Sequence, residues 1–168
     1  MVEMLVVTAI VGVLTATISF SLTKVRTTAL AARTLEDFQT IETAVIGYSV
    51  TNRVSLPTSV NYNIDDMVAG TVTAFPNFDV FLKEVPHPPA WGTYRYVGSA
   101  DLSINCSAAA EGILISLVAS GANNQQLSDI YDRLEKKVDS SVDSNCGTIR
   151  KQGNTLYYMI ADGPADVF

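Results

Sequence analysis

The chain begins with a long apolar run. The 20 residues from Met4 to Thr23 include no charged side chain and no proline. As a helix this run would extend about 30 Å, which matches the hydrocarbon thickness of a bilayer. The pattern therefore predicts a membrane-spanning helix. A buried core helix and the apolar part of a signal peptide are the alternatives, but a signal peptide opens with basic residues, whereas the first four residues carry only Glu3.

The helical pattern continues beyond the apolar run. No proline occurs before Pro57. Charged and polar residues fill the other faces of this stretch: Arg33, Glu36, Asp37, Gln39 and Glu42. The sequence predicts one helix over about residues 1–50, with an apolar half (1–23) and an amphipathic half (24–50). The apolar residues of the second half recur in steps of three and four: Ala31, Leu35, Phe38, Ile41, Val45 and Tyr48.

The sequence over the remaining residues, 51–168, predicts a globular head. Between the expected strands, Gln125–Val138 has apolar residues at helical spacing and lysines near its end, where they suit the helix dipole. Together with the long helix, this pattern predicts an α+β fold. The four runs that read as strands are Gly92–Val97, Gly112–Ala119, Thr148–Lys151 and Leu156–Ala161.

The composition excludes or disfavours several classes of protein. The chain has a net charge of −6, a sequence pI of about 4.6 and a mean hydropathy of +0.23. The high apolar content excludes a disordered chain, and the acidic balance disfavours direct binding of nucleic acid. No phosphate-binding glycine loop, nucleophile elbow or metal-ligand pair occurs, so we expect neither an enzyme nor a cofactor. His87 stands alone in a proline-rich loop, which disfavours a metal ligand or general base there.

Three segments together resemble a known family. The first 14 residues, MVEMLVVTAIVGVL, resemble the N-terminal methylation motif of type IV pilins and type II secretion pseudopilins, with the acid at Glu3 and a glycine at Gly12. The segment IGYSVTNRVSLPTS (Ile46–Ser59) resembles the turn that closes their long helix. PAWGTYRY (Pro89–Tyr96) resembles a tryptophan-glycine-tyrosine segment of major pseudopilins, in which Trp91, Tyr94 and Tyr96 are expected in the core.

The resemblance implies a pilin-like fold and a structural role. Its fold would be a long N-terminal helix, membrane-spanning in its first half (1–23), packed on a small antiparallel β-sheet head. The subunit would reside in the inner membrane and then polymerise through its N-terminal helices into a cell-surface filament, with 1–23 forming the filament core. Glu3 would pair with the N-terminal amine of a neighbouring subunit, and Gly12 would be a flexible point. A prepilin peptidase, a cytoplasmic assembly ATPase and a platform membrane protein are the implied partners.

Two other functions remain open from the sequence. A pseudopilin of a type II secretion system would share the helix, although Pro88, Pro89 and Ala90 replace the acid of the family's calcium-site segment and so favour a pilin. A monomeric, single-pass, membrane-anchored binding module would need no acid at Glu3. The sequence does not distinguish adhesion, twitching motility, DNA uptake and secretion as the filament's use.

The head carries two further candidate sites. Cys106 and Cys146 would form a disulfide if the head lies in an oxidising compartment, and many type IV pilins have one such bridge in the second half of the head. Two unpaired buried thiols are the alternative. Asp139, Asp143 and Asn145 are weak calcium candidates, because their spacing matches no EF-hand and a solvated turn explains them as well.

Overall fold

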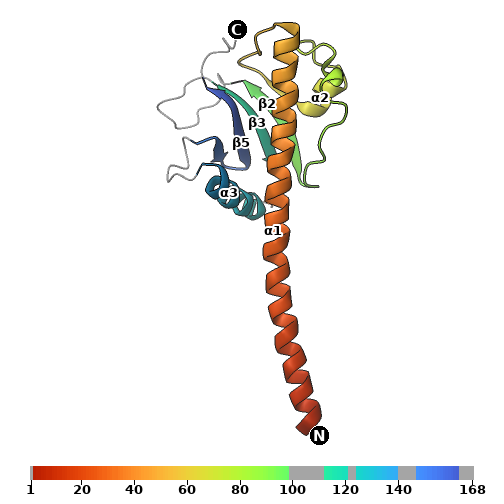
Figure 1. Ribbon diagram of the computed structural model, residues 1–168, viewed down its shortest axis with the longest axis vertical. Helices are drawn as coiled ribbons and strands as arrows, with labels where there is room; N and C mark the ends of the chain where they lie inside the picture. The colour runs from red at the N-terminus through yellow and green to blue at the C-terminus, as the bar shows by residue number, and fades with distance from the viewer. Residues whose placement is uncertain (1, 99–111, 121–123, 140–146, 163–168) are drawn as a thin grey trace.

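A long helix crosses one face of an antiparallel sheet (Figure 1). The computed structural model describes residues 2–98, 112–120, 124–139 and 147–162, without side chains at residues 2, 3, 5, 16–23, 112, 161 and 162. The sheet has five strands in the order β1-β2-β3-β5-β4, and every neighbouring pair is antiparallel. The elements are α1 (Val2–Asn52), β1 (Asn61–Asn63), α2 (Ile64–Val68), a 3₁₀ turn η1 (Phe78–Val80), β2 (Gly92–Gly98), β3 (Gly112–Ala119), α3 (Asn124–Val138), β4 (Ile149–Gln152) and β5 (Thr155–Asp162).

The upper part of α1 packs on the sheet through the predicted stripe. Every member of that stripe, from Ala31 to Tyr48, is buried, and Phe38, Ile41 and Val45 are completely so. The steps of three and four keep these side chains on one face of the helix, which meets the inner face of the sheet. Below this region the helix leaves the head and projects alone toward the N-terminus (Figure 1). The helix is 51 residues long, which corresponds to about 75 Å.

The predicted membrane-spanning half of this helix is corrected by the structure. Within the described part of the chain, no helix combines the length and the apolarity that crossing a membrane requires. The continuous apolar stretch with described side chains runs over residues 6–15. Ten residues of helix extend about 15 Å, roughly half the thickness of a bilayer core. The fold is therefore α+β with a five-stranded antiparallel sheet, and the expectation of a spanning segment at residues 1–23 is wrong.

The alternation of residues along the strands gives the sheet two distinct faces. Tyr94 and Tyr96 on β2 are fully buried and point to the inner face, where they join the core under α1. Arg95, between them, belongs to the opposite face together with its cross-strand neighbours Ser116 on β3 and Tyr157 on β5. The four strands and the second helix expected from the sequence are all present, with ends within two residues of the predicted positions.

The segment between α1 and β2 contains elements that the sequence pattern did not predict. These are β1, α2 and η1, of three, five and three residues. Such short elements carry too few residues to display a period. They are held by an aromatic cluster instead, in which the ring of Phe75 lies 5.2 Å from that of Tyr48, 5.7 Å from Phe78 and 5.1 Å from Tyr96. The cluster attaches this segment to the upper end of α1 and to the edge of the sheet.

Candidate functional site: an apolar stalk and its anchorage

The part of α1 below the head projects as a rod away from the other described elements (Figure 1). We call residues 2–26 the stalk. All of its described side chains are exposed to solvent. Large contiguous apolar surfaces of this kind mark interaction sites in soluble proteins. The exposed fractions lie between 52% and 76% for the seven large apolar side chains of its lower part: Met4, Val6, Val7, Ile10, Val11, Val13 and Leu14.

The hydroxyl groups of the stalk bond to the stalk itself. Thr8 Oγ1 donates to the carbonyl of Met4 at 3.0 Å, and Thr15 Oγ1 donates to the carbonyl of Val11 at 2.6 Å. Each bond spans one helical turn, so the donor is used within the helix. Over residues 6–15, the stalk therefore presents apolar side chains around most of its circumference. A helix that is apolar all round is normally buried in a larger assembly.

Glu3 and Gly12, the two assembly residues implied by the resemblance, both lie on the stalk. Glu3 occupies the first turn of α1, where a carboxylate is favoured by the helix dipole; its side chain lies outside the described residues. A Cβ atom placed on Gly12 would meet no other atom within 4 Å. No contact within the monomer therefore requires a glycine at this position.

A buried hydrogen bond anchors α1 to the sheet. The Tyr94 hydroxyl donates to Oδ2 of Asp37 at 2.7 Å, and Asp37 is only 9% exposed. Phe38, the next residue on the helix, packs between two rings of the sheet, edge-on to Tyr94 at 5.7 Å and stacked on Tyr158 at 5.4 Å. The sequence pattern placed Asp37 on a polar face of the helix, and the structure corrects this, because its carboxylate is turned into the helix–sheet interface.

A second tyrosine makes a similar bond nearer the edge of the interface. The Tyr158 hydroxyl donates to Oε2 of Glu42 at 2.9 Å. Burial, together with the bond to Glu42, raises the pKa of Tyr158 to about 12. Burial and the bond to Asp37 likewise raise the pKa of Tyr94. Both hydroxyls are therefore protonated donors at neutral pH, and both hold the head to the helix.

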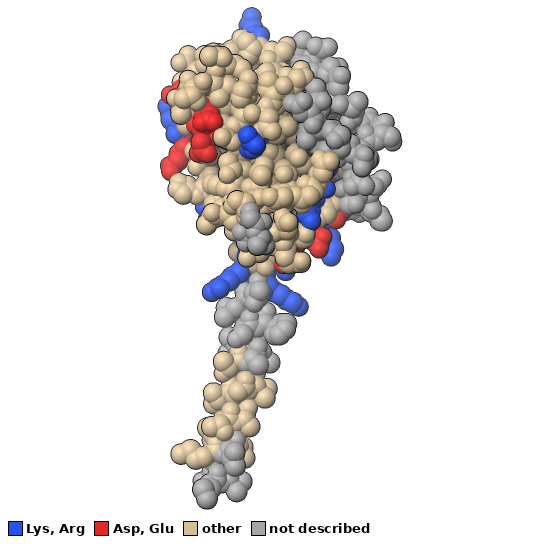
Figure 2. All heavy atoms as spheres, turned by 180° about the vertical axis from the view of Figure 1, so that it is seen from behind, with Lys and Arg blue, Asp and Glu red and all other residues tan. Residues whose placement is uncertain are grey.

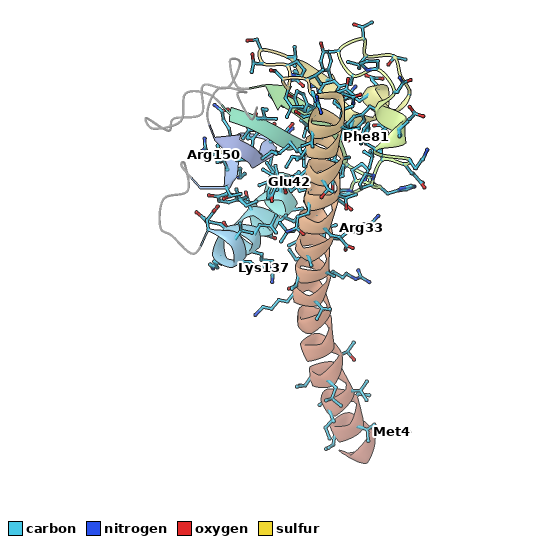
Figure 3. The ribbon with its side chains drawn as sticks, turned by 45° about the horizontal axis from the view of Figure 1, so that its top comes forward. Met4, Arg33, Glu42, Phe81, Lys137 and Arg150 are labelled. Atoms are coloured by element: carbon cyan, nitrogen blue, oxygen red, sulfur yellow. The ribbon has the colours of Figure 1, made fainter. Side chains whose placement is uncertain are left out.

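A third contact fixes the level at which the stalk leaves the head. Arg133 of α3 donates from Nη1 to the Thr28 hydroxyl of α1 at 2.5 Å, and Thr28 donates in turn to the carbonyl of Lys24 at 2.8 Å. Figure 3 shows Arg33 and Glu42 within the head and Met4 at the free end of the helix. The stalk is thus the continuation of a helix that the head holds at several points.

The residues weighed for metal or acid–base chemistry have structural surroundings. His87 is exposed, its Nδ1 lies 3.9 Å from Oε1 of Glu84, and its carbonyl accepts a 3.0 Å bond from Arg33. Asp139 accepts the backbone N–H groups of Thr148 and Ile149, both at 2.8 Å, which ties the end of α3 to the start of β4. Among the described residues, no group of three or more His, Cys, Asp or Glu side chains could hold a metal ion.

Several predicted site residues cannot be placed. Cys106 and Cys146 fall outside the described residues, and so do Asp143 and Asn145. The proposed disulfide and the two remaining calcium candidates therefore stay predictions. In the aromatic segment, Tyr94 and Tyr96 are buried as expected, whereas Trp91 is only partly buried.

The anchoring role of Asp37, Glu42 and Arg133 was not predicted from the sequence. A signal was available for the first two. Buried tyrosines normally find a partner for the hydroxyl group, and the helix facing the strands offers acids in successive turns. No signal was available for Arg133, because its partner lies 105 residues away in the chain.

Comparisons with known proteins identify no relative of the chain. No protein-family model matches it, and neither a curated protein nor a solved structure does so.

Proposed function

We propose that the protein is a structural subunit of a type IV pilus-like extracellular filament that polymerises through its N-terminal helix. The single observation that carries this proposal is the stalk, whose large apolar side chains project into solvent from the end of a firmly anchored helix. The resemblance of the first 14 residues to the N-terminal methylation motif supports the same conclusion. Processing by a prepilin peptidase and handling by pilus assembly machinery are part of the proposal.

The energetics favour burial of the stalk against other copies. Moving a Val, Leu or Ile side chain from water into a packed interior contributes about 1.5–3 kcal/mol. The stalk side chains are a little more than half exposed, so each has roughly half of that contribution still to gain. Because apolar groups point to all sides, one neighbour cannot cover them. A bundle of several stalks can, with the heads displayed around it.

A matched pair of variants tests this proposal. Val6 on the stalk and Val50 in the last turns of α1 are 52% and 50% exposed, so a glutamate at either position leaves the monomer fold intact. We expect Val6→Glu to abolish filaments, because a carboxylate buried in an apolar bundle costs several kcal/mol. Val50→Glu is the control and should polymerise as the unaltered protein does. Filaments sheared from expressing cells are counted by electron microscopy and quantified by sedimentation.

The outcomes separate the rival functions. Equal filament yield from both variants would overturn the role of the stalk. A discrete monomer for the unaltered protein, without filaments on cells, would favour a binding module. Loss of exoprotein secretion on deletion, in cells without surface filaments, would favour a secretion pseudopilin, which shares the polymerising helix.

A further inference from the structure

Two surfaces of opposite charge lie at different levels of the head. The first, which we call the acidic flank, consists of Asp65 and Asp66 on α2 and Asp79 on η1, all exposed. Acidic side chains gather on this side of the upper head in Figure 2, with a basic side chain beside them. The aromatic contacts of Phe78 and Phe81 with Tyr48 place the flank near the upper end of α1.

The second surface, which we call the basic collar, surrounds the point where the stalk meets the head. It consists of Lys24 and Arg26 on α1 and of Lys136 and Lys137 in the last turn of α3, all exposed. The Arg133–Thr28 hydrogen bond joins the two helices at this level. Figure 2 shows basic side chains spreading from the junction, and Figure 3 shows Lys137 on the underside of the head.

Among the described residues, the charged groups of both surfaces form no ion pair, although Oδ2 of Asp66 accepts a 3.1 Å hydrogen bond from Nδ2 of Asn63. Over the described residues, the single pair of opposite charges within 4.0 Å is His87 with Glu84, and it belongs to neither surface. On α3 near the collar, Glu135 accepts from Tyr131 at 2.9 Å and Asp129 accepts from Gln125 at 3.1 Å, whereas the exposed Asp132 lies one turn before Lys136. Lys24, Arg26 and Lys137 have no acid three or four residues away on their own helix, so these cations are left to face a partner.

We propose that the acidic flank of one copy binds the basic collar of the next copy in the filament. This inference rests on the proposed function and names the surfaces that set the arrangement of the heads. Because the two surfaces differ, the contact is heterologous, and a heterologous contact that does not close into a ring builds an open helical polymer. The flank lies near the level of Tyr48 and the collar near that of Arg26. The contact therefore shifts successive copies by about 35 Å along the helix axis.

This shift would also bury part of the exposed apolar surface of the stalk. A copy raised by about 35 Å brings its own stalk beside the lower head part of the first copy's α1. The exposed side of α1 at that level carries Val25, Ala29 and Ala32, which are apolar or small. Small side chains let a second helix approach closely. The same displacement thus pairs the charges and covers part of the stalk.

Charge reversal on the two surfaces tests the proposal. We expect Asp65→Lys with Asp79→Lys to raise the critical concentration for polymerisation of the purified full-length chain by about tenfold or more, because attraction becomes repulsion at each pair. Lys136→Glu with Lys137→Glu should have the same effect. Combining all four substitutions should restore polymerisation, and this rescue cannot come from a merely structural effect. Arg53→Glu, an exposed reversal outside both surfaces, is the control.

The possible results are distinguishable. Sedimentation and electron microscopy after detergent removal measure polymer, and thermal unfolding checks that each variant folds. If the unaltered chain forms filaments and both reversed variants do so equally, or if the combined variant is not rescued, the contact is refuted and the filament function stands. If the unaltered chain forms no filaments, the proposed function fails and this contact fails with it.

Discussion

Oδ2 of Asp37 accepts a 2.7 Å hydrogen bond from the hydroxyl of Tyr94 inside the interface between the long helix and the sheet. Tyr94 is 1% exposed, so neither group has water as an alternative partner. A buried carboxylate without a donor is costly, and a buried hydroxyl without an acceptor is costly too. The bond therefore fixes which residues of α1 lie over β2.

Tyr94→Phe should destabilise the head by about 1–3 kcal/mol, because it leaves a buried carboxylate oxygen without its donor. Urea denaturation followed by circular dichroism gives the free energy of unfolding. The matched variant is Tyr158→Phe, whose partner Glu42 is only partly buried and can turn to water. Its loss should be smaller, and a larger loss from Tyr158→Phe would contradict this ranking.

Stability should fall in alkaline solution. The pKa of Tyr158 is raised to about 12, above the value of about 10 for an unfolded tyrosine. The folded state therefore holds this proton more tightly than the unfolded state. The resulting stabilisation is complete below about pH 10 and is lost as the pH rises toward about 12. Urea midpoints measured between pH 8 and pH 12 should decline only in the upper part of this range, and Tyr158→Phe should make the decline shallower without removing it, because burial also raises the pKa of Tyr94. A midpoint that stays constant would refute the effect.

Gly147→Ala should be destabilising although the residue lies in a connection. A Cβ atom there would lie 2.6 Å from Cγ of Asp139, whose carboxylate accepts two backbone N–H groups at the start of β4. Forcing the carboxylate aside costs about 1–3 kcal/mol. The loss should appear as a lower melting temperature. In a double-mutant cycle with Asp139→Ala, the two losses should be less than additive, and full additivity would show that the clash is not with Asp139.

Glu3→Ala should leave the monomer folded and stop or weaken filament growth, because the resemblance gives this acid the role of pairing with the amine of a neighbouring copy. Glu36→Ala, at an exposed glutamate on the same helix, controls for the loss of one negative charge. Filament mass per cell is the measurement. Normal yield from Glu3→Ala would remove the assembly role of this residue.

Much of the fold could be predicted because its elements are long enough to show a period. The stripe from Ala31 to Tyr48 and the strand at Gly112–Ala119 are examples; the stripe is buried, and so are residues 113–117 and Ala119 of the strand. The segment from Asn61 to Val80 could not be predicted, because ring contacts between distant residues organise it and local periodicity does not. The hydropathy of the apolar run also predicted a membrane-spanning helix. Within the described residues, no helix is long and apolar enough to span a membrane.

The candidate site, too, could be predicted only in part from the sequence. The apolar character of the stalk could be predicted, because its apolar residues follow one another in the sequence. Asp37 could not be distinguished from its polar neighbour Glu36 on the sequence alone, because a rotation of one residue, about 100°, decides which carboxylate faces the sheet. That rotation is set by the packing of Phe38 between two tyrosine rings.

The threonines of the stalk have a mechanical consequence. Since Thr8 and Thr15 bond to carbonyls of their own helix, one stalk can slide along another without breaking either of these bonds. Methyl groups in contact resist such sliding only weakly, and they meet new methyl groups at the next position. In the proposed bundle, resistance to stretching would therefore come from contacts between the heads and from the pairing of Glu3 with a neighbouring amine, and methyl contacts between stalks would add little.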